Sequence, residues 1–433
     1  MNNVLRILLI FIIFSSCSLN KNSKFWTNKK IKVEEQNNSK EIFAKEKLLN
    51  MEINPNLKIS LYAKLIDKSF INNNDNNNGR VNYNGELKNI SKFKYSKIIN
   101  FDQYEPEILF HKQNIIFFDN KGTIFKFNNE SELIWEKNHY SKLEKKQKPI
   151  LFFANNNKIL IVGDNIAKYY ALDIESGKLI WMKNSIAPFN SQIKIYKDKF
   201  FIIDFQNILR CYSIKNGKEI WNRKTQNSLI SSQKKLSLVI LKNKLYFNNT
   251  LGDITAVNLN DGELLWQSPT QSSLTTSENF FLKTSDLIAD QSALYFSNNK
   301  NEFFSFDLNS GSINWKQKIN STLRPTLIDN YIFTVSIEGY LFIIEKNSGK
   351  IIRSTNIFKN FKPKKRLKIK PSGFIVGKDN IYLTTTNGKL LIIGIENGQT
   401  KSIIKIDNET VLRPSVSNKS LYIAKDNSII KLN

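Results

Sequence analysis

Cysteine and histidine, which supply many metal ligands and nucleophiles, are almost missing from this chain. Its 433 residues include two cysteines, Cys17 and Cys211, and two histidines, His111 and His139. The cysteines form no CxxC pair, and the histidines show no spacing typical of metal ligands. There is also no Gly-rich phosphate loop and no Gly-x-Ser-x-Gly elbow. The sequence therefore offers no candidate catalytic residue and no candidate metal ligand.

Glycine, proline and acidic residues are scarce as well. The chain has 16 Gly and 9 Pro against 30 Phe and 15 Tyr, and aromatic enrichment favours β-strands. It has 38 Asp and Glu against 64 Lys and Arg, which gives a net charge of +26. A basic protein can attract nucleic acid, an anionic membrane or an acidic partner. The lysines are spread along the chain, and the export signal described next argues against nucleic acid.

Residues 1–16 predict a lipoprotein signal peptide. Arg6 precedes the apolar run Ile7–Phe14, which fits a secretory signal and is too short for a membrane-spanning helix of roughly 20 residues. Two serines then lead to Cys17. This pattern resembles a bacterial lipobox, and the resemblance implies cleavage before Cys17 and acylation of its thiol. Ser18 follows where an Asp often signals inner-membrane retention, so we expect attachment to the periplasmic face of the outer membrane.

The residues that follow predict a polar tether. Residues 17–84 are rich in Asn, Lys and Ser and include the near-homopolymer Asn72–Asn78. Such a segment buries too little apolar surface to offset the entropy lost on ordering. The short apolar patch Leu57–Ile66 leaves open whether part of the tether docks. Residues 85–433 are expected to form the folded domain.

The folded domain contains an internal repeat. The stretches 170–181, 211–221, 255–266 and 304–315 each show an alternating apolar strand, a polar turn ending in Gly, and then Trp. An earlier copy, 125–135, has Ser in place of the Gly. Successive turns lie roughly 40–50 residues apart, a period typical of β-propeller blades.

Most of the tryptophans occupy one position of this repeat. We expect each Trp to pack between neighbouring blades and each Gly to supply the positive φ of the turn. Aspartates that recur before the turn are expected to cap it and not to act in catalysis. The structural repeat residues are Trp135, Gly177, Trp181, Gly217, Trp221, Gly262, Trp266, Gly311 and Trp315.

The repeat predicts an all-β, eight-bladed propeller of four-stranded antiparallel blades. Residues 323–358 show four strands joined by short polar turns, and seven such copies run from about 104 to 406. Residues 411–433 supply only three further strands. The strand-like stretch 93–99 can add the fourth, which would close the ring with strands from both ends of the chain.

The motif D-x-x-[SN]-G-x-x-x-W resembles the PQQ-type propeller repeat over about 330 residues. Two kinds of protein carry it, the quinoprotein dehydrogenases and the BamB lipoproteins of the outer-membrane β-barrel assembly machine. The lipobox, the polar tether and the eight blades are similar to the BamB family. The resemblance implies a non-catalytic scaffold without a cofactor, docked on BamA through the POTRA domains of that protein.

The resemblance also implies contact residues. Family members present a Leu/Arg motif and acidic residues on loops of one face. The corresponding stretches here are 229–233 and 283–286, which keep an apolar pair and one acid but lack the Arg. The implied partner-binding residues are Leu229, Ile230 and Asp286. Two other functions stay open: a lipid-anchored propeller that binds another envelope partner, and a degenerate PQQ-dependent dehydrogenase.

Replacing Cys17 with Ser is expected to release the protein from membranes, because the tether has no other strong apolar anchor. Each buried methylene of an acyl chain contributes about 0.8 kcal/mol, so loss of the acyl chains removes the main attachment. Membrane fractionation in high salt measures this. Retention of the Cys17→Ser protein in the membrane fraction would argue against lipidation.

Overall fold

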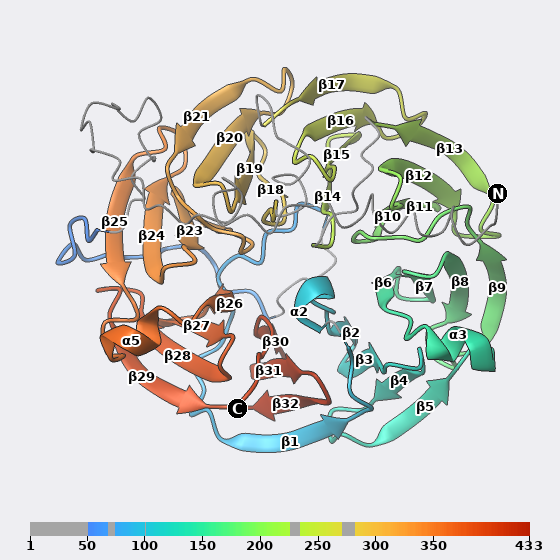
Figure 1. Ribbon diagram of the computed structural model, residues 1–433, viewed down its shortest axis with the longest axis horizontal. Helices are drawn as coiled ribbons and strands as arrows, with labels where there is room; N and C mark the ends of the chain where they lie inside the picture. Colours follow the sequence, from blue (N-terminus) through green and yellow to red (C-terminus); the bar gives the residue numbers. More distant parts are fainter. Residues whose placement is uncertain (1–50, 68–73, 100, 226–233, 271–281) are drawn as a thin grey trace, which may run out of the picture. The chain divides into compact units, whose positions relative to one another are not determined.

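The computed structural model describes residues 51–67, 74–99, 101–225, 234–270 and 282–433. The chain divides into two units, Met1–Lys47 and Leu48–Asn433. The first unit, with the predicted signal peptide and Cys17, lies outside the described residues. The second unit is a β-propeller. Its described part holds eight four-stranded antiparallel sheets arranged as blades around a central axis (Figure 1).

Seven blades consist of consecutive strands, ordered from the axis outward. Their bounds are β2–β5 (Leu109–His111, Asn114–Phe118, Ile124–Phe127, Leu133–Lys137), β6–β9 (Leu151–Asn155, Ile159–Asp164, Lys168–Asp173, Leu179–Asn184), β10–β13 (Lys194–Tyr196, Lys199–Ile203, Ile208–Ser213, Glu219–Lys224), β14–β17 (Leu238–Leu241, Lys244–Asn248, Ile254–Asn258, Leu264–Ser268), β18–β21 (Ile288–Ala289, Ala293–Asn298, Glu302–Asp307, Ile313–Gln317), β22–β25 (Thr326–Ile328, Tyr331–Val335, Tyr340–Glu345, Ile351–Asn356) and β26–β29 (Pro371–Val376, Asn380–Thr385, Lys389–Gly394, Thr400–Lys405).

The eighth blade combines both ends of the propeller sequence, as expected. It contains β30 (Ser415–Ser417), β31 (Ser420–Lys425), β32 (Ser428–Leu432) and, outermost, β1 (Asn89–Lys94). The closing strand was predicted at 93–99 and begins earlier. Lys94 pairs with Ser428, the first residue of β32, so the chain beyond Lys94 meets a turn and has no further strand to pair with.

Blade stacking explains the burial pattern of the strands. Middle strands have a neighbouring blade on both faces, and all six residues of β19 are buried. Several outermost strands are largely exposed, and in β5 only Trp135 is buried. Middle strands therefore need continuous apolar runs, whereas an outermost strand such as β5 needs one large anchor.

The recurring Gly and Trp residues contact each other across neighbouring blades. Gly217 has a φ of 65°, and a Cβ there would lie 2.6 Å from the ring of Trp181 in the preceding blade. Both the backbone conformation and the space therefore require glycine at this turn. The same contact joins Gly177 with Trp135, Gly262 with Trp221, Gly311 with Trp266 and Gly349 with Trp315.

The recurring aspartates cap these turns. The Oδ1 atom of Asp173 accepts hydrogen bonds from the backbone N and the hydroxyl of Ser176 at 2.8 and 2.6 Å. Asp307 makes the same two bonds to Ser310, both at 2.8 Å. Hydrogen bonds from Ser176 lower the pKa of the Asp173 carboxyl, which is typical of a turn-capping acid.

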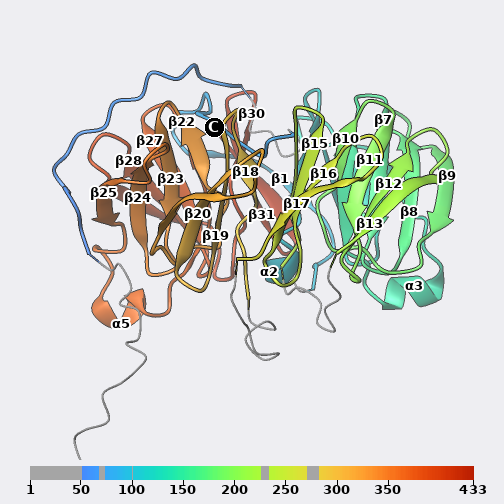
Figure 2. The same ribbon diagram turned by 90° about the horizontal axis from the view of Figure 1, so that it is seen from above.

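Short helices mark one face of the propeller. The helices α2 (Phe101–Tyr104), α3 (Lys142–Lys146) and α5 (Pro363–Arg366) lie in connections that lead to an innermost strand. Figure 2 shows them on the same side of the disc, at the bottom of the view. No helix among the described residues has the length and apolarity needed to cross a membrane.

The structure differs from the sequence prediction for residues 51–84. The sequence predicts a tether, whereas 51–67 and 74–83 pack on the propeller. Ile53 and Ser354 exchange two backbone hydrogen bonds of 3.1 and 2.9 Å at the outer edge of β25. Ile59, inside the apolar patch, is only 5% exposed. The prediction from composition was wrong for this segment, because its polar side chains and backbone groups form hydrogen bonds with groups that the blades leave unpaired.

Gly262→Ser is expected to lower the free energy of unfolding by about 2 kcal/mol or more. The φ of 74° penalises a Cβ, and the Cβ would lie 2.5 Å from Trp221. Ser131 holds the same turn position in β2–β5 with a φ of 70°. Ser131→Gly is the matched reverse change, expected to stabilise by up to about 1 kcal/mol. Urea unfolding of both variants checks this, and a neutral Gly262→Ser would contradict the contact.

Candidate functional site

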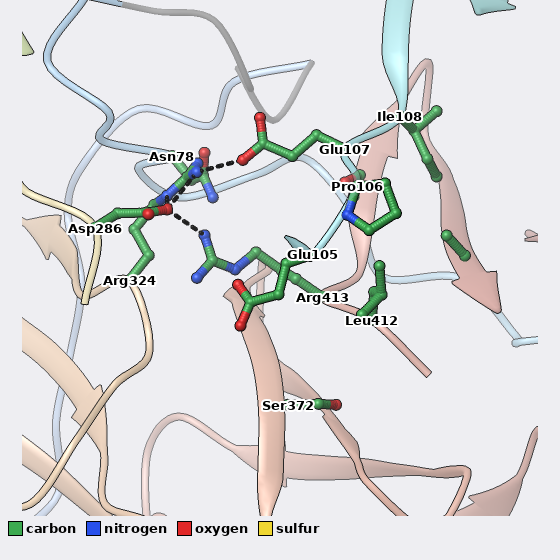
Figure 3. Close-up of a pocket in the computed structure, with 12 residues that line it drawn as sticks. Asn78, Glu105, Pro106, Glu107, Ile108, Asp286, Arg324, Ser372, Leu412 and Arg413 are labelled. Carbon is green, nitrogen blue, oxygen red and sulfur yellow. Dashed lines mark hydrogen bonds and ion pairs between the residues drawn. The ribbon is translucent and has the colours of Figure 1, made fainter. Parts of the chain in front are cut away.

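Charged residues converge on the propeller axis. Each innermost strand starts from the helix-bearing face, so residues just before these strands come together from separate blades. Glu107 precedes β2, Asp286 precedes β18, Arg324 precedes β22 and Arg413 precedes β30. Figure 3 shows these side chains pointing toward one another around a small pocket. We call Glu107, Lys235, Asp286, Arg324 and Arg413 the axial cluster.

Arg324 is the centre of the axial cluster. Its guanidinium lies 2.6 Å from the Asp286 carboxylate and 2.7 Å from Glu107 Oε1. Lys235 Nζ lies 3.1 Å from the same Glu107 oxygen, and Arg413 lies 3.9 Å from Asp286. The side chains of Arg324 and Asp286 are 2% and 6% exposed, so this ion pair operates largely away from water and breaks only at a large energetic cost.

The electrostatics of the cluster keep its carboxylates charged. Burial alone would raise the pKa of Asp286, but the positive charges of Arg324, Lys234 and Arg413 outweigh burial and hold that pKa below its usual value. Glu107 behaves in the same way. Burial opposes its ionisation, and Lys235 and Arg324 lower its pKa. A general acid or base needs a pKa near the working pH, so these carboxylates are suited to structure and not to proton transfer.

The opposite mouth of the channel is filled by the chain itself. The backbone carbonyl of Asn74 accepts a hydrogen bond from Ile240 N at 2.8 Å, and that of Asp75 accepts one from Ala289 N at 3.1 Å. Asn77 Oδ1 accepts a hydrogen bond from Leu327 N at 3.0 Å. Residues 74–78 therefore cross β14, β18 and β22 in turn. We call this segment the axial plug.

Asn76 is the most deeply buried side chain of the plug. Its Nδ2 atom lies within 3.1 Å of four acceptors, which are Gln192 Oε1, Ser237 Oγ and the carbonyl oxygens of Leu238 and Leu287. Lys194 Nζ donates to Asn76 Oδ1 at 2.5 Å. Burial, together with the positive charge of Arg324, lowers the pKa of Lys194 to about 7.

Two cavities at the axis are lined by described residues, and both are small. The cavity beside Arg324 and Arg413 has a volume of about 40 Å³, and that beside Lys235 and Leu151 about 20 Å³. Sites for small molecules and cofactors usually have volumes of about 300–1,000 Å³. A tricyclic quinone cofactor does not fit either cavity. No group of three or more potential metal ligands occurs among the described residues.

The predicted partner-binding residues have different outcomes. Leu229, Ile230 and the predicted lipidation site Cys17 lie outside the described residues. Asp286 was expected on an exposed loop, and this expectation does not hold. The residue is 4% exposed and its carboxylate is paired with Arg324. The connection that carries Asp286 leads inward to β18 at the axis, where counter-charges stabilise the buried acid.

Two features of the surface and axis were missed at the sequence level. The axial plug was assigned to the tether because its composition is that of a disordered segment. Apolar side chains just before the Trp position form an exposed band along several outermost strands, 39–49% exposed, at Leu133, Ile134, Leu179, Ile180, Ile220, Leu264, Leu265 and Ile313. Their recurrence in the repeat was visible in the sequence, but their exposure depends on which strand lies outermost.

Asp286→Asn is expected to reduce the free energy of unfolding by about 3 kcal/mol at pH 7, because it weakens the pairing of the buried Arg324. The folded-state pKa of Asp286 is depressed, so the advantage of the wild type is complete above the unfolded pKa of about 3.9 and declines progressively as the pH falls from there through the folded pKa. Urea unfolding at pH 7 and pH 3 tests both statements. Asp290→Asn, at the partly exposed pair with Lys346, is the control and should cost less than about 1 kcal/mol. Equal losses in the two variants would contradict the central role of Arg324.

Several solved structures are similar to this chain at low sequence identity. BamB from Moraxella catarrhalis has a TM-score of 0.62 at 15% identity and covers 80% of this chain and 99% of its own. The quinohemoprotein alcohol dehydrogenase from Comamonas testosteroni has 0.61 at 10% identity, with coverages of 82% and 78%. A europium-containing methanol dehydrogenase has 0.64 at 10% identity, with coverages of 84% and 90%. At such identities the likeness shows the fold alone.

Sequence comparison distinguishes between the BamB family and the dehydrogenases. No curated protein matches the chain significantly. The family model described as "Outer membrane protein assembly factor BamB" matches residues 120–355, which is more than half of the chain. The match spans the blades in which the Gly and Trp positions recur. This chain therefore belongs to the BamB family of PQQ-repeat β-propellers.

Proposed function

We propose that this protein is a non-catalytic scaffold lipoprotein of the outer-membrane β-barrel assembly complex, which docks in the periplasm on the POTRA domains of a BamA-like protein. Membership of the BamB family supports this function. The observation that carries it is the channel, which is filled from one side by Asn74–Asn78 and closed around Arg324 by ion pairs. With its axis occupied in this way by described residues, the propeller would bind partners through its surface.

Several observations support a non-catalytic role. The carboxylates of the axial cluster are ion-paired and their pKa values are lowered, so neither acts as a proton shuttle near neutral pH. Cys211 is fully buried, and burial raises the pKa of its thiol to about 12, which makes it a poor nucleophile. Adding PQQ and Ca²⁺ to the purified protein tests the alternative dehydrogenase function. A redox-active complex would contradict the proposal.

The membrane attachment in this proposal comes from Cys17. Acylation there would place the protein at the periplasmic face of the outer membrane. The described chain begins at Met51, whose carbonyl accepts a hydrogen bond from Ser354 Oγ at 2.9 Å on the outer strand β25. The predicted tether is thus shorter than the sequence indicates, because residues 51–67 and 74–83 pack on the propeller.

The docking surface is proposed on the helix-bearing face. The connection between β13 and β14 contains Leu229 and Ile230, two apolar residues in a polar stretch. Connections of this kind project from a rigid body, and two or three adjacent ones can supply the roughly 800 Å² per partner of an ordinary interface. Asp286 is excluded from this surface because it is buried in the axial cluster.

The combined change Leu229→Asp and Ile230→Asp is expected to weaken binding to purified POTRA domains by tenfold or more, since central apolar anchors each contribute about 1–2 kcal/mol or more. Calorimetry measures the affinity, and the melting temperature should stay unchanged. The matched control is Leu143→Asp with Ile186→Asp, at side chains 72% and 85% exposed on the same face. Unaltered binding, a lower melting temperature or an equal loss in the control would each reject this loop as the contact.

A further inference from the structure

The connection that contains α5 carries the densest positive charge among the described residues. Seven of the twelve residues 359–370 are Lys or Arg and none is acidic, against 64 Lys and Arg in the 433 residues of the chain. All six lysines of this stretch are exposed. No ion pair to any of them occurs in the described part of the chain. We call residues 359–370 the basic loop.

The basic loop is held in a defined shape. Pro363 occupies the start of α5, and Arg366 donates hydrogen bonds to the carbonyl oxygens of Phe361 and Lys359 at 2.7 and 2.6 Å. Ile369 is buried in the core cluster that also contains Phe358. The one arginine of the loop and its apolar side chains at 361 and 369 therefore fix the backbone, while the lysines remain free to meet a partner.

One apolar side chain of the loop is not used for packing. Leu367 is 86% exposed and lies between Arg366 and Lys368. Its neighbours in the sequence on both sides are cations. The combination of several exposed lysines and an exposed apolar side chain is the one with which basic surface segments bind anionic bilayers.

The chain enters the propeller beside this loop. A groove of about 400 Å³ is lined by Glu52, Pro55 and Asn56 on one side and by Lys359 and Asn360 on the other. The residues that follow the proposed acyl anchor thus join the described structure next to the start of the basic loop. An anchor that holds the protein at a bilayer raises the effective concentration of that bilayer for a second, weak contact.

We propose that the basic loop is a membrane-docking surface that binds the anionic phospholipid headgroups of a bilayer through its lysines and inserts Leu367 among them. Each lysine near an anionic surface strengthens binding by a factor of about five, and salt screens this contribution. α5 lies across the ring from β13 in Figure 1, so the loop leaves the proposed POTRA-binding connection free. The inference uses the membrane attachment of the proposed function and goes beyond it by naming a second contact.

The experiment measures co-sedimentation of the chain from Ser18 onward with vesicles. This protein lacks the leader and the acyl anchor but keeps the whole propeller unit with its own core. We expect binding to vesicles of 30% phosphatidylglycerol in phosphatidylcholine, weakened by salt, and none to pure phosphatidylcholine. Because the assay contains neither anchor nor partner protein, its failure would leave the proposed function untouched.

Matched variants locate the contact. Replacing Lys362, Lys364, Lys365 and Lys368 by Gln should reduce vesicle affinity about a hundredfold or more. Leu367→Ser, which leaves the charge unchanged, should reduce it about tenfold. The control replaces four exposed lysines in turns on the opposite face, with the same loss of charge, and should change affinity less than threefold; these are Lys178, Lys215, Lys218 and Lys350.

The remaining outcomes overturn the proposal. Equal losses in the loop and control variants would mean that net charge alone binds the vesicles. Tighter binding to polyglutamate than to the anionic vesicles would assign the loop to an acidic protein. Displacement by inorganic phosphate at constant ionic strength would indicate a site for the free ion and not for a bilayer.

Discussion

The pairing of β1 with β32 is the constraint on which the rest of the molecule depends. A propeller with an unclosed blade would leave a gap between its first and last sheets, with an unpaired edge and two uncovered apolar faces. Here the closing strand comes from the N-terminal side, so the chain must reach the outside of the last blade before the first complete blade begins. The described chain starts at the outer edge of β25 and crosses the propeller before it enters β1. The axial plug lies on this crossing path.

The plug also meets a requirement at the axis. Eight innermost strands face a common channel, and their inner edges present backbone N–H and C=O groups that no neighbouring strand can satisfy. Amide side chains and peptide groups of the plug offer the same kinds of donor and acceptor as a β-strand. In the plug, however, these groups are not regularly spaced. Asn76 bonds to groups of β14 and of the residue before β18 through one amide. Asparagine suits a site of this kind because it carries both a donor and an acceptor on a short side chain.

The sequence could predict the blades but not the axis. The Gly and Trp positions are close in sequence and repeat with every blade, so their spacing reveals the strand order and the ring. The axial cluster joins Asp286 and Arg324 from two neighbouring blades with Glu107 from a remote one, and only the convergence of the connections brings them together. The same reason explains why Asp286 was expected on the surface. A loop residue between two strands is usually exposed, but the last residues of these connections point to the axis.

Charge has two physical roles in this protein, and burial distinguishes them. At the axis, the buried Arg324 has two carboxylates close by, because an unpaired charge away from water costs several kcal/mol. In the basic loop no such pairing is needed, because solvent stabilises each lysine. Folding therefore determines which residues pair with the axial charges. It does not require several unpaired lysines close in sequence to an exposed Leu367. Folding does not require this feature of the basic loop, which adds repulsion between lysines and exposes apolar surface. A contact with a partner outside the chain accounts for this sequence best.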